Sequence, residues 1–342
     1  MQSHKKQIKG VIKMVKNMDL SDVKIGDDLK STLDLNIKRI NKNTGKYFTP
    51  TLIIFNYVKY VNESVLNGCD DKKQYVKTAE TLLKELKDAG FVVGDDWRDN
   101  NKLPYSKGNK KLSKDTLIIN VSPALLCISK NMGFCGLCGV CYAHSSERRY
   151  INTLIYRLSQ LVRFQKLSAD EIITQFKRLR VVKWLRVNES GDIFDMEDAL
   201  KLLAIAEGLF TLKGVKTYLY THRVDLWDDL KALQTPFFKV NRSDVDFIAV
   251  SEIKSGHKSL FCDGDCNNCI YCKIELNTPV SALLHGDAVG VDLRDAETRK
   301  RDLKLKWECL KLYNMGCDVD EIKDHIAHTL NGCETAIRWS VI

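Results

Sequence analysis

The clustering of its cysteines constrains this chain more than any other feature. Eight of the 12 cysteines fall in two short windows: Cys127, Cys135, Cys138 and Cys141, and then Cys262, Cys266, Cys269 and Cys272. Each window holds three cysteines at C-x2-C-x2-C spacing, preceded by a fourth. Thiols two residues apart suit metal chelation better than a disulfide framework in a chain of this length that lacks a secretory signal. Both windows therefore predict metal sites.

The spacing also bears on which metal is bound. Three thiolates in one tight loop favour an iron–sulfur cluster, because a mononuclear zinc site usually takes two thiolates from each of two separate knuckles. We favour iron–sulfur over zinc in the first window and weigh the two equally in the second. A structural zinc ribbon with two ligands from each window is the alternative, and it would leave four thiols over. The isolated Cys69, Cys309, Cys317 and Cys333 are expected to be buried apolar thiols.

The composition is that of a folded chain, with 44% hydrophobic and 28% charged residues over 342 positions. No apolar stretch approaches the roughly twenty residues of a membrane span, and the basic N-terminus lacks the apolar core of a secretory signal, so we expect a cytoplasmic protein without membrane contact. The net charge of +9 favours polyanionic partners only weakly. Residues 147–186 are the most basic stretch, and we interpret them first as solvated helix faces and second as a nucleic-acid contact.

The pattern along the chain divides it into three parts. Residues 1–114 are predicted to form an N-terminal α+β region with a basic start, a β-rich stretch at 48–60 and a helix at 71–89. Residues 115–290 are predicted to form a metal-cluster domain in which strands and helices alternate. Residues 291–342 are predicted to form a helical C-terminal segment with helices at 296–314 and 319–330, which we interpret as a packing cap.

The middle part predicts an α/β fold. Apolar runs predict strands at 116–121, 181–187, 216–220 and 246–250, and periodic segments predict helices at 146–167, 168–179, 196–209 and 226–233. Ser168 opens a capping box with Glu171, and Asp195 is a candidate N-cap. Right-handed crossovers make such strands parallel, and ligands then bind beyond their carboxyl ends.

The segments that follow these strands are polar. They are the first cysteine window, residues 188–192, residues 221–223 and residues 251–252. Each alone is better explained as a turn, a surface loop or a helix cap than as a functional segment. Together they predict one site at one end of the sheet.

This order of features resembles the radical S-adenosylmethionine (SAM) superfamily, in which a strand leads into a three-cysteine loop with an aromatic residue beside the last cysteine, here Cys141 and Tyr142. More specifically, residues 138–143, 186–192 and 220–223, with the late C-x2-C-x2-C run before an apolar strand and His285, look like the phage gene product 88 family. The resemblance covers about residues 115–290. The cysteine spacing departs from the C-x3-C-x2-C of that superfamily.

The resemblance implies a partial (β/α) barrel of radical-SAM type, a 4Fe–4S cluster on Cys135, Cys138 and Cys141, and reductive cleavage of SAM that acts on a nucleotide, nucleic acid or protein. If Cys127 is also a ligand, it fills the iron on which SAM would bind, and the site is then structural or transfers electrons. The second window resembles an auxiliary cluster held by four cysteines. An electron donor would be the partner of such an enzyme.

The resemblance also implies residue roles, while it leaves the catalytic residues unidentified. The residues implied to bind the cofactor are Tyr142, Glu189, Gly191, Asp192, Thr221 and Ser251. Those implied to contact a carboxylate or phosphate are Arg186, His222 and Arg223. The alternative function is a non-enzymatic phage or plasmid protein whose structural zinc or iron–sulfur sites support nucleic-acid binding. If phage-encoded, the protein would work in the host cytoplasm.

Overall fold

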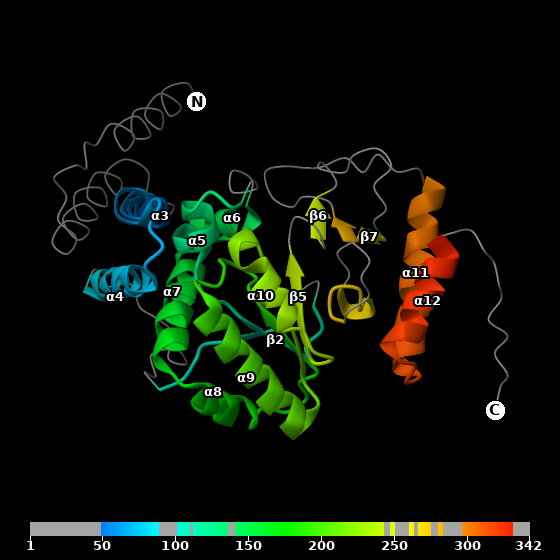
Figure 1. The fold of residues 1–342 in the computed structure, drawn as a ribbon. Helices are drawn as coiled ribbons and strands as arrows, with labels where there is room; N and C mark the ends of the chain where they lie inside the picture. The colour runs from blue at the N-terminus through cyan, green and yellow to red at the C-terminus, as the bar shows by residue number, and fades with distance from the viewer. Residues whose placement is uncertain are drawn as a thin grey trace.

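The computed structural model describes residues 49–88, 101–109, 112–135, 141–242, 247–249, 260–262, 266–274, 280–282 and 296–330. A five-stranded sheet lies at its centre, in the order β1-β2-β3-β4-β5 (Figure 1). The strands are β1 (Ser106–Lys107), β2 (Thr116–Ile119), β3 (Trp184–Val187), β4 (Lys216–Thr221) and β5 (Phe238–Arg242). β1 is an antiparallel edge strand, and β2 to β5 run parallel, so their carboxyl ends meet at one edge of the sheet. The chain is thus a mixed α/β protein.

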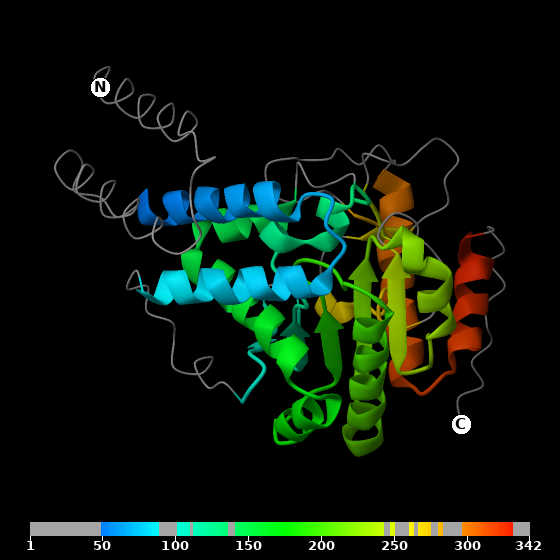
Figure 2. The same cartoon turned by 60° about the vertical axis from the view of Figure 1, so that its left-hand side comes forward.

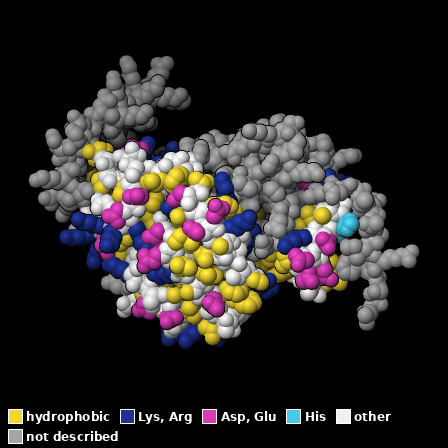
Figure 3. All heavy atoms as spheres, in the orientation of Figure 1, with side chains coloured by type: hydrophobic (Ala, Val, Ile, Leu, Met, Phe, Trp, Pro, Cys, Tyr) yellow, Lys and Arg dark blue, Asp and Glu magenta, His cyan; other side chains and the backbone are white. Residues whose placement is uncertain are grey.

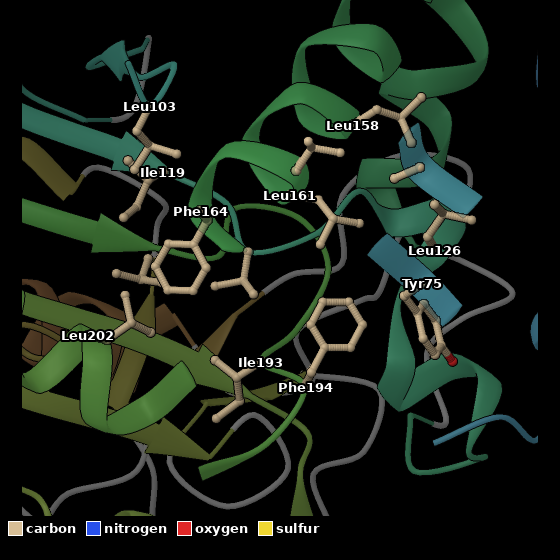
Figure 4. Close-up of a cluster of buried hydrophobic side chains, with 14 of the residues drawn as sticks. Tyr75, Leu103, Ile119, Leu126, Leu158, Leu161, Phe164, Ile193, Phe194 and Leu202 are labelled. Carbon is tan, nitrogen blue, oxygen red and sulfur yellow. The ribbon is translucent and has the colours of Figure 1, made fainter. Parts of the chain in front are cut away.

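Helices that connect the parallel strands cover one face of this sheet. They are α7 (Ile151–Lys166), α8 (Ala169–Phe176), α9 (Met196–Lys213) and α10 (Trp227–Ala232). Because successive side chains of a strand point to opposite faces, Ile119, Leu185 and Leu219 enter the core on this side. Figure 4 shows Ile119 beside Phe164 of α7, with Leu202 of α9 and Ile193 and Phe194 nearby.

Local capping explains where these helices begin and end. The capping box of Ser168 and Glu171 is formed at the start of α8, and the Asp195 carboxylate accepts a hydrogen bond from the Asp198 amide at the start of α9. α9 ends at Gly214, whose φ of 67° is left-handed. The predicted capping box, N-cap and strand–helix alternation are confirmed here.

The predicted β-rich stretch at 48–60 is wrong, because this segment is helical. α3 (Thr49–Val61) continues into a short π-helical turn (Asn62–Leu66), and α4 (Lys72–Asp88) follows. Buried Ile54, Val58 and Val61 recur every three or four residues, so a helix buries them on one side despite their β-branched side chains. Figure 2 shows α3 and α4 side by side, where they pack against α6 and α7.

Three other elements differ from the expectation. The helix predicted at 146–167 is two helices, α6 (Tyr142–Arg149) and α7, separated at Tyr150 by extended backbone. β5 was not predicted. The strand predicted at 246–250 is observed as β6 (Phe247–Ala249), but it belongs to a separate parallel sheet of order β6-β8-β7, with β7 (Leu260–Cys262) and β8 (Val280–Ala282).

The C-terminal helices α11 (Ala296–Asn314) and α12 (Val319–Leu330) have the predicted bounds. They contribute Leu305, Leu312 and Ile326 to a second core, which also contains Trp184 and Tyr218 from the sheet. That core therefore lies on the sheet face opposite α7 and α9. No helix within the described residues is long and apolar enough to cross a membrane. The division at residues 114 and 290 stays a prediction.

Candidate functional site

Asp192 joins the segments that follow three strands. It lies in the turn after β3, is 1% exposed, and accepts hydrogen bonds at 2.7 Å from Ser129 Oγ, Thr221 Oγ1 and the His222 amide. Ser129 belongs to α5 (Ile128–Asn131), directly after Cys127, and Thr221 is the last residue of β4. Burial raises the pKa of Asp192, and the nearby His222 and these donors oppose that rise. Three of the four strand-end segments predicted to converge are therefore held together by one carboxylate, and the fourth, residues 251–252, lies outside the described residues.

The turn after β3 has a backbone that few residues permit. Asn188 has a φ of 64°, and its Oδ1 accepts a hydrogen bond from the Val121 amide at 3.1 Å. Gly191 has a φ of 69°, and a Cβ there would lie 2.1 Å from Ser122 Oγ and 2.3 Å from the Ser122 carbonyl oxygen. Gly191, predicted to bind a cofactor, thus has a structural reason to be glycine, since it lets the two segments approach closely.

Glu147 of α6 fixes the start of the first cysteine loop. Its fully buried carboxylate accepts hydrogen bonds from the amides of Ala124 and Leu125 at 2.8 and 3.0 Å. The same carboxylate pairs with Arg157 of α7 at 2.9 Å and accepts from Ser190 Oγ at 3.0 Å. Sequence reasoning missed this residue, whose only signal is an acid at the start of the basic stretch 147–186.

The N-terminal helices contact the same loop. Asn62, after α3, exchanges two side-chain hydrogen bonds with Asn131 of α5 at 2.8 and 2.9 Å. Asn131 also donates to the Tyr75 hydroxyl of α4 at 2.9 Å. The segment that carries Cys127 is therefore packed between the sheet and the N-terminal helices.

The cysteines of the first window lie in one neighbourhood. Cys127 precedes α5, Cys141 precedes α6, and both interact electrostatically with Cys135. Burial is the main cause that raises the pKa of the Cys127 and Cys141 thiols. Cys138 lies in residues 136–140, outside the described part of the chain. Within the described residues, no three Cys, His, Asp or Glu side chains are close enough together to hold one metal ion.

The second cysteine window packs on the sheet face opposite α7 and α9. Cys269 and Cys272 lie against the second core. The backbone carbonyl of Cys272 accepts a hydrogen bond from Asn241 Nδ2 of β5 at 2.9 Å, and that of Cys266 accepts one from Lys273 Nζ at 2.7 Å. Cys262 is the last residue of β7. The two windows thus lie at different parts of the central sheet.

The remaining predicted residues differ in how the fold uses them. Arg223 is 7% exposed and is used within the fold, because its guanidinium pairs with Asp225 at 2.7 Å and donates to the carbonyls of Ile193 and Phe194. Glu189 and Tyr142 face outward from the same edge, and the Tyr142 hydroxyl donates to the Glu189 carbonyl at 2.5 Å. Ser251 lies outside the described residues.

The fold and this site define a class: a mixed α/β protein with a cysteine-bearing loop at the carboxyl ends of parallel strands. Residues 98–236 match a family model described as Gene product 88. The match runs from β1 to α10, so it includes the first cysteine window and Asp192, whereas the second window lies beyond it. No curated protein and no solved structure gave a match.

Proposed function

We propose that this chain is an iron–sulfur protein similar to radical SAM enzymes, built on a partial (β/α) barrel. One observation carries the proposal. The loop with Cys127, Cys135 and Cys141 follows β2, and Asp192 bonds this loop to the ends of β3 and β4. Ligands of parallel α/β sheets bind at this edge.

The chemistry of the thiol donors supports an iron–sulfur cluster. Cys135 and Cys141 are half-buried, so they would bind a cluster that is shielded from water yet open on one side. Cys138 is the third ligand in this proposal. A bound cluster of this kind supplies the electron that cleaves SAM.

The contacts of Asp192 and Glu189 indicate different roles for the two residues. Both carboxylate oxygens of Asp192 already accept two hydrogen bonds each, so its role is to position the loop and β4. The Glu189 side chain is 23% exposed, and within the described residues its carboxylate accepts one hydrogen bond, from Asn109 at 3.0 Å. Glu189 therefore keeps acceptor capacity for an ammonium or ribose hydroxyl, and Tyr142 lies beside it.

Metal analysis of anaerobically purified protein tests the proposal. We expect iron and sulfide in the wild-type chain and an electron paramagnetic resonance signal, after reduction, that SAM perturbs. Cys135→Ser and Cys138→Ser should lose that signal, whereas Cys317→Ser, in the turn between α11 and α12, should keep it. Zinc alone, or a signal that ignores SAM, would contradict the proposal.

Two further points belong to the same experiment. Iron that survives in Cys127→Ser would show an open site, and its loss would show that Cys127 closes the cluster. The second window is proposed as an auxiliary cluster or zinc site, so Cys269→Ser should lower metal content without changing the SAM-dependent signal. An electron donor is the partner that this chemistry requires.

Nucleic-acid binding with structural zinc is less well supported. Of the basic residues in 147–186, Arg157 is buried against Glu147, and Lys166 pairs with Glu80 at 2.6 Å. On the face in Figure 3, Lys and Arg side chains are scattered among acidic and apolar ones. A steep fall of DNA or RNA affinity with salt would revive this alternative.

A further inference from the structure

Arg186 is a half-buried cation with no hydrogen-bonded or ion-paired partner in the described part of the chain. Its Nε is buried without a hydrogen-bond acceptor, and no carboxylate there lies within ion-pair distance of it. Two other arginines at this end of the sheet differ, since Arg157 pairs with Glu147 at 2.9 Å and Arg223 with Asp225 at 2.7 Å. A buried charge without a counter-charge is costly, and proteins keep one where a ligand supplies the partner.

Tyrosines surround this guanidinium. Arg186 of β3 is in register with Tyr218 of β4, and both point to the sheet face opposite α7 and α9. The Arg186 guanidinium carbon lies 5.4 Å from the centre of the Tyr220 ring. Aromatic rings orient the guanidinium through their faces but cannot neutralise its charge.

The surroundings also offer an unused donor. The Tyr218 hydroxyl is buried and has no hydrogen-bond partner in the described residues, and the side chain is 2% exposed. Tyr142, beside Cys141, also interacts electrostatically with Arg186. A ligand at Arg186 would therefore lie between the sheet and the end of the first cysteine loop.

We propose that Arg186 and the Tyr218 hydroxyl form a binding site for an oxyanion, the carboxylate or phosphate group of a small molecule. A guanidinium binds either group through two parallel hydrogen bonds, and a phenol adds a third donor. Glu189 interacts electrostatically with Arg186, but its carboxylate accepts a hydrogen bond from Asn109 and lies 3.8 Å from Arg157, so it does not fill the site. This inference stands apart from the proposed cluster, because oxyanion binding needs no iron.

Thermal unfolding of the full chain, titrated with phosphate or succinate against sodium chloride of equal ionic strength, tests the site. We expect a saturable rise of the unfolding midpoint with at least one of the two oxyanions. Phosphate alone would identify a phosphate group, succinate alone a carboxylate, and both a general oxyanion site. No saturable rise with either would overturn the proposal.

Variants tie that rise to the two residues. Arg186→Met should abolish it, Tyr218→Phe should weaken the apparent affinity about tenfold, and Arg178→Met, on an exposed loop, should leave it unchanged. Without oxyanions, Arg186→Met should be at least as stable as the wild type. A lower midpoint there would show that the protein already pairs Arg186, and would overturn the proposal. If Arg186→Met does not fold, Arg186→Lys can replace it. This variant keeps the charge but loses the paired N–H donors of the guanidinium, and it should bind the oxyanion at least about fivefold more weakly.

Discussion

The Asp192 carboxylate accepts a hydrogen bond from the Thr221 hydroxyl at 2.7 Å, which ties the turn after β3 to the last residue of β4. The same carboxylate reaches Ser129 in the helix after Cys127. Asp192 therefore sets the distance between the cysteine loop and two strand ends.

Asp192→Asn should destabilise the protein by about 2–4 kcal/mol, because an amide puts a donor where two of the existing donors need an acceptor. Urea denaturation measures this change. Asp324→Asn, at an exposed position of α12, is the control and should change stability by less than about 0.5 kcal/mol. Equal stability of the two variants would show that the Asp192 hydrogen bonds do not hold the site.

Gly191→Ala and Gly214→Ala form a matched pair. Both glycines have φ near 70°, but a Cβ at Gly191 would collide with the Ser122 backbone, whereas a Cβ at Gly214 meets nothing within 4 Å. We expect Gly214→Ala to cost about 1–2 kcal/mol and Gly191→Ala to cost clearly more, or to prevent folding. Denaturation midpoints compare them. A similar cost at both sites would mean that the strand ends are less closely packed than described.

Glu147→Gln should cost about 3–5 kcal/mol, because it leaves the buried Arg157 charge without its partner. In the double variant with Arg157→Met, the losses should not add, since the second change removes that unpaired charge. A double-mutant cycle by urea denaturation measures the coupling. Additive losses would show that the two side chains act independently.

The pH dependence of stability should report Asp225. Its hydrogen bonds from Arg223 hold the pKa of that carboxyl below its usual range, so the stability it contributes is complete above its unfolded pKa, roughly 3.9, and is lost as pH falls through the lower folded pKa. Asp225→Asn should be less stable than the wild type at pH 6 by about 1 kcal/mol or less, since Asp225 is partly exposed. The difference should shrink below roughly pH 3.9. A difference that is constant from pH 6 to pH 3 would contradict this assignment.

The sequence predicted the parallel strands and their connecting helices because those elements carry strong apolar periodicity and recognisable caps, as at Ser168 and Asp195. The sequence did not predict β5, because the polar Lys239 and Asn241 alternate with the apolar Phe238 and Val240. The polar face of this strand is buried on the sheet face that carries the second core. The helix at Thr49–Val61 was taken for strand because its composition is β-branched and aromatic.

The position of the site at the strand ends could also be predicted, since topology places them together. The hydrogen bonds within the site could not be predicted. Those between Asp192 and Ser129, or between Glu147 and the Ala124 amide, join residues whose separation in sequence follows no local pattern. For the same reason, the sequence could not show that Arg223 pairs with a carboxylate and Arg186 does not, because this depends on which residues lie nearby in space.

The Glu147 carboxylate has a consequence for motion in the first cysteine loop. Because this buried carboxylate accepts hydrogen bonds from the amides of Ala124 and Leu125, those two amide protons should exchange with solvent only when α6 separates from the turn at Ala124–Leu126. The backbone of the loop is therefore fixed up to Leu125. If the loop binds a metal, any rearrangement on binding must begin at or beyond Leu126. Metal binding would then change the conformation only of residues after Leu125 and leave the central sheet unchanged.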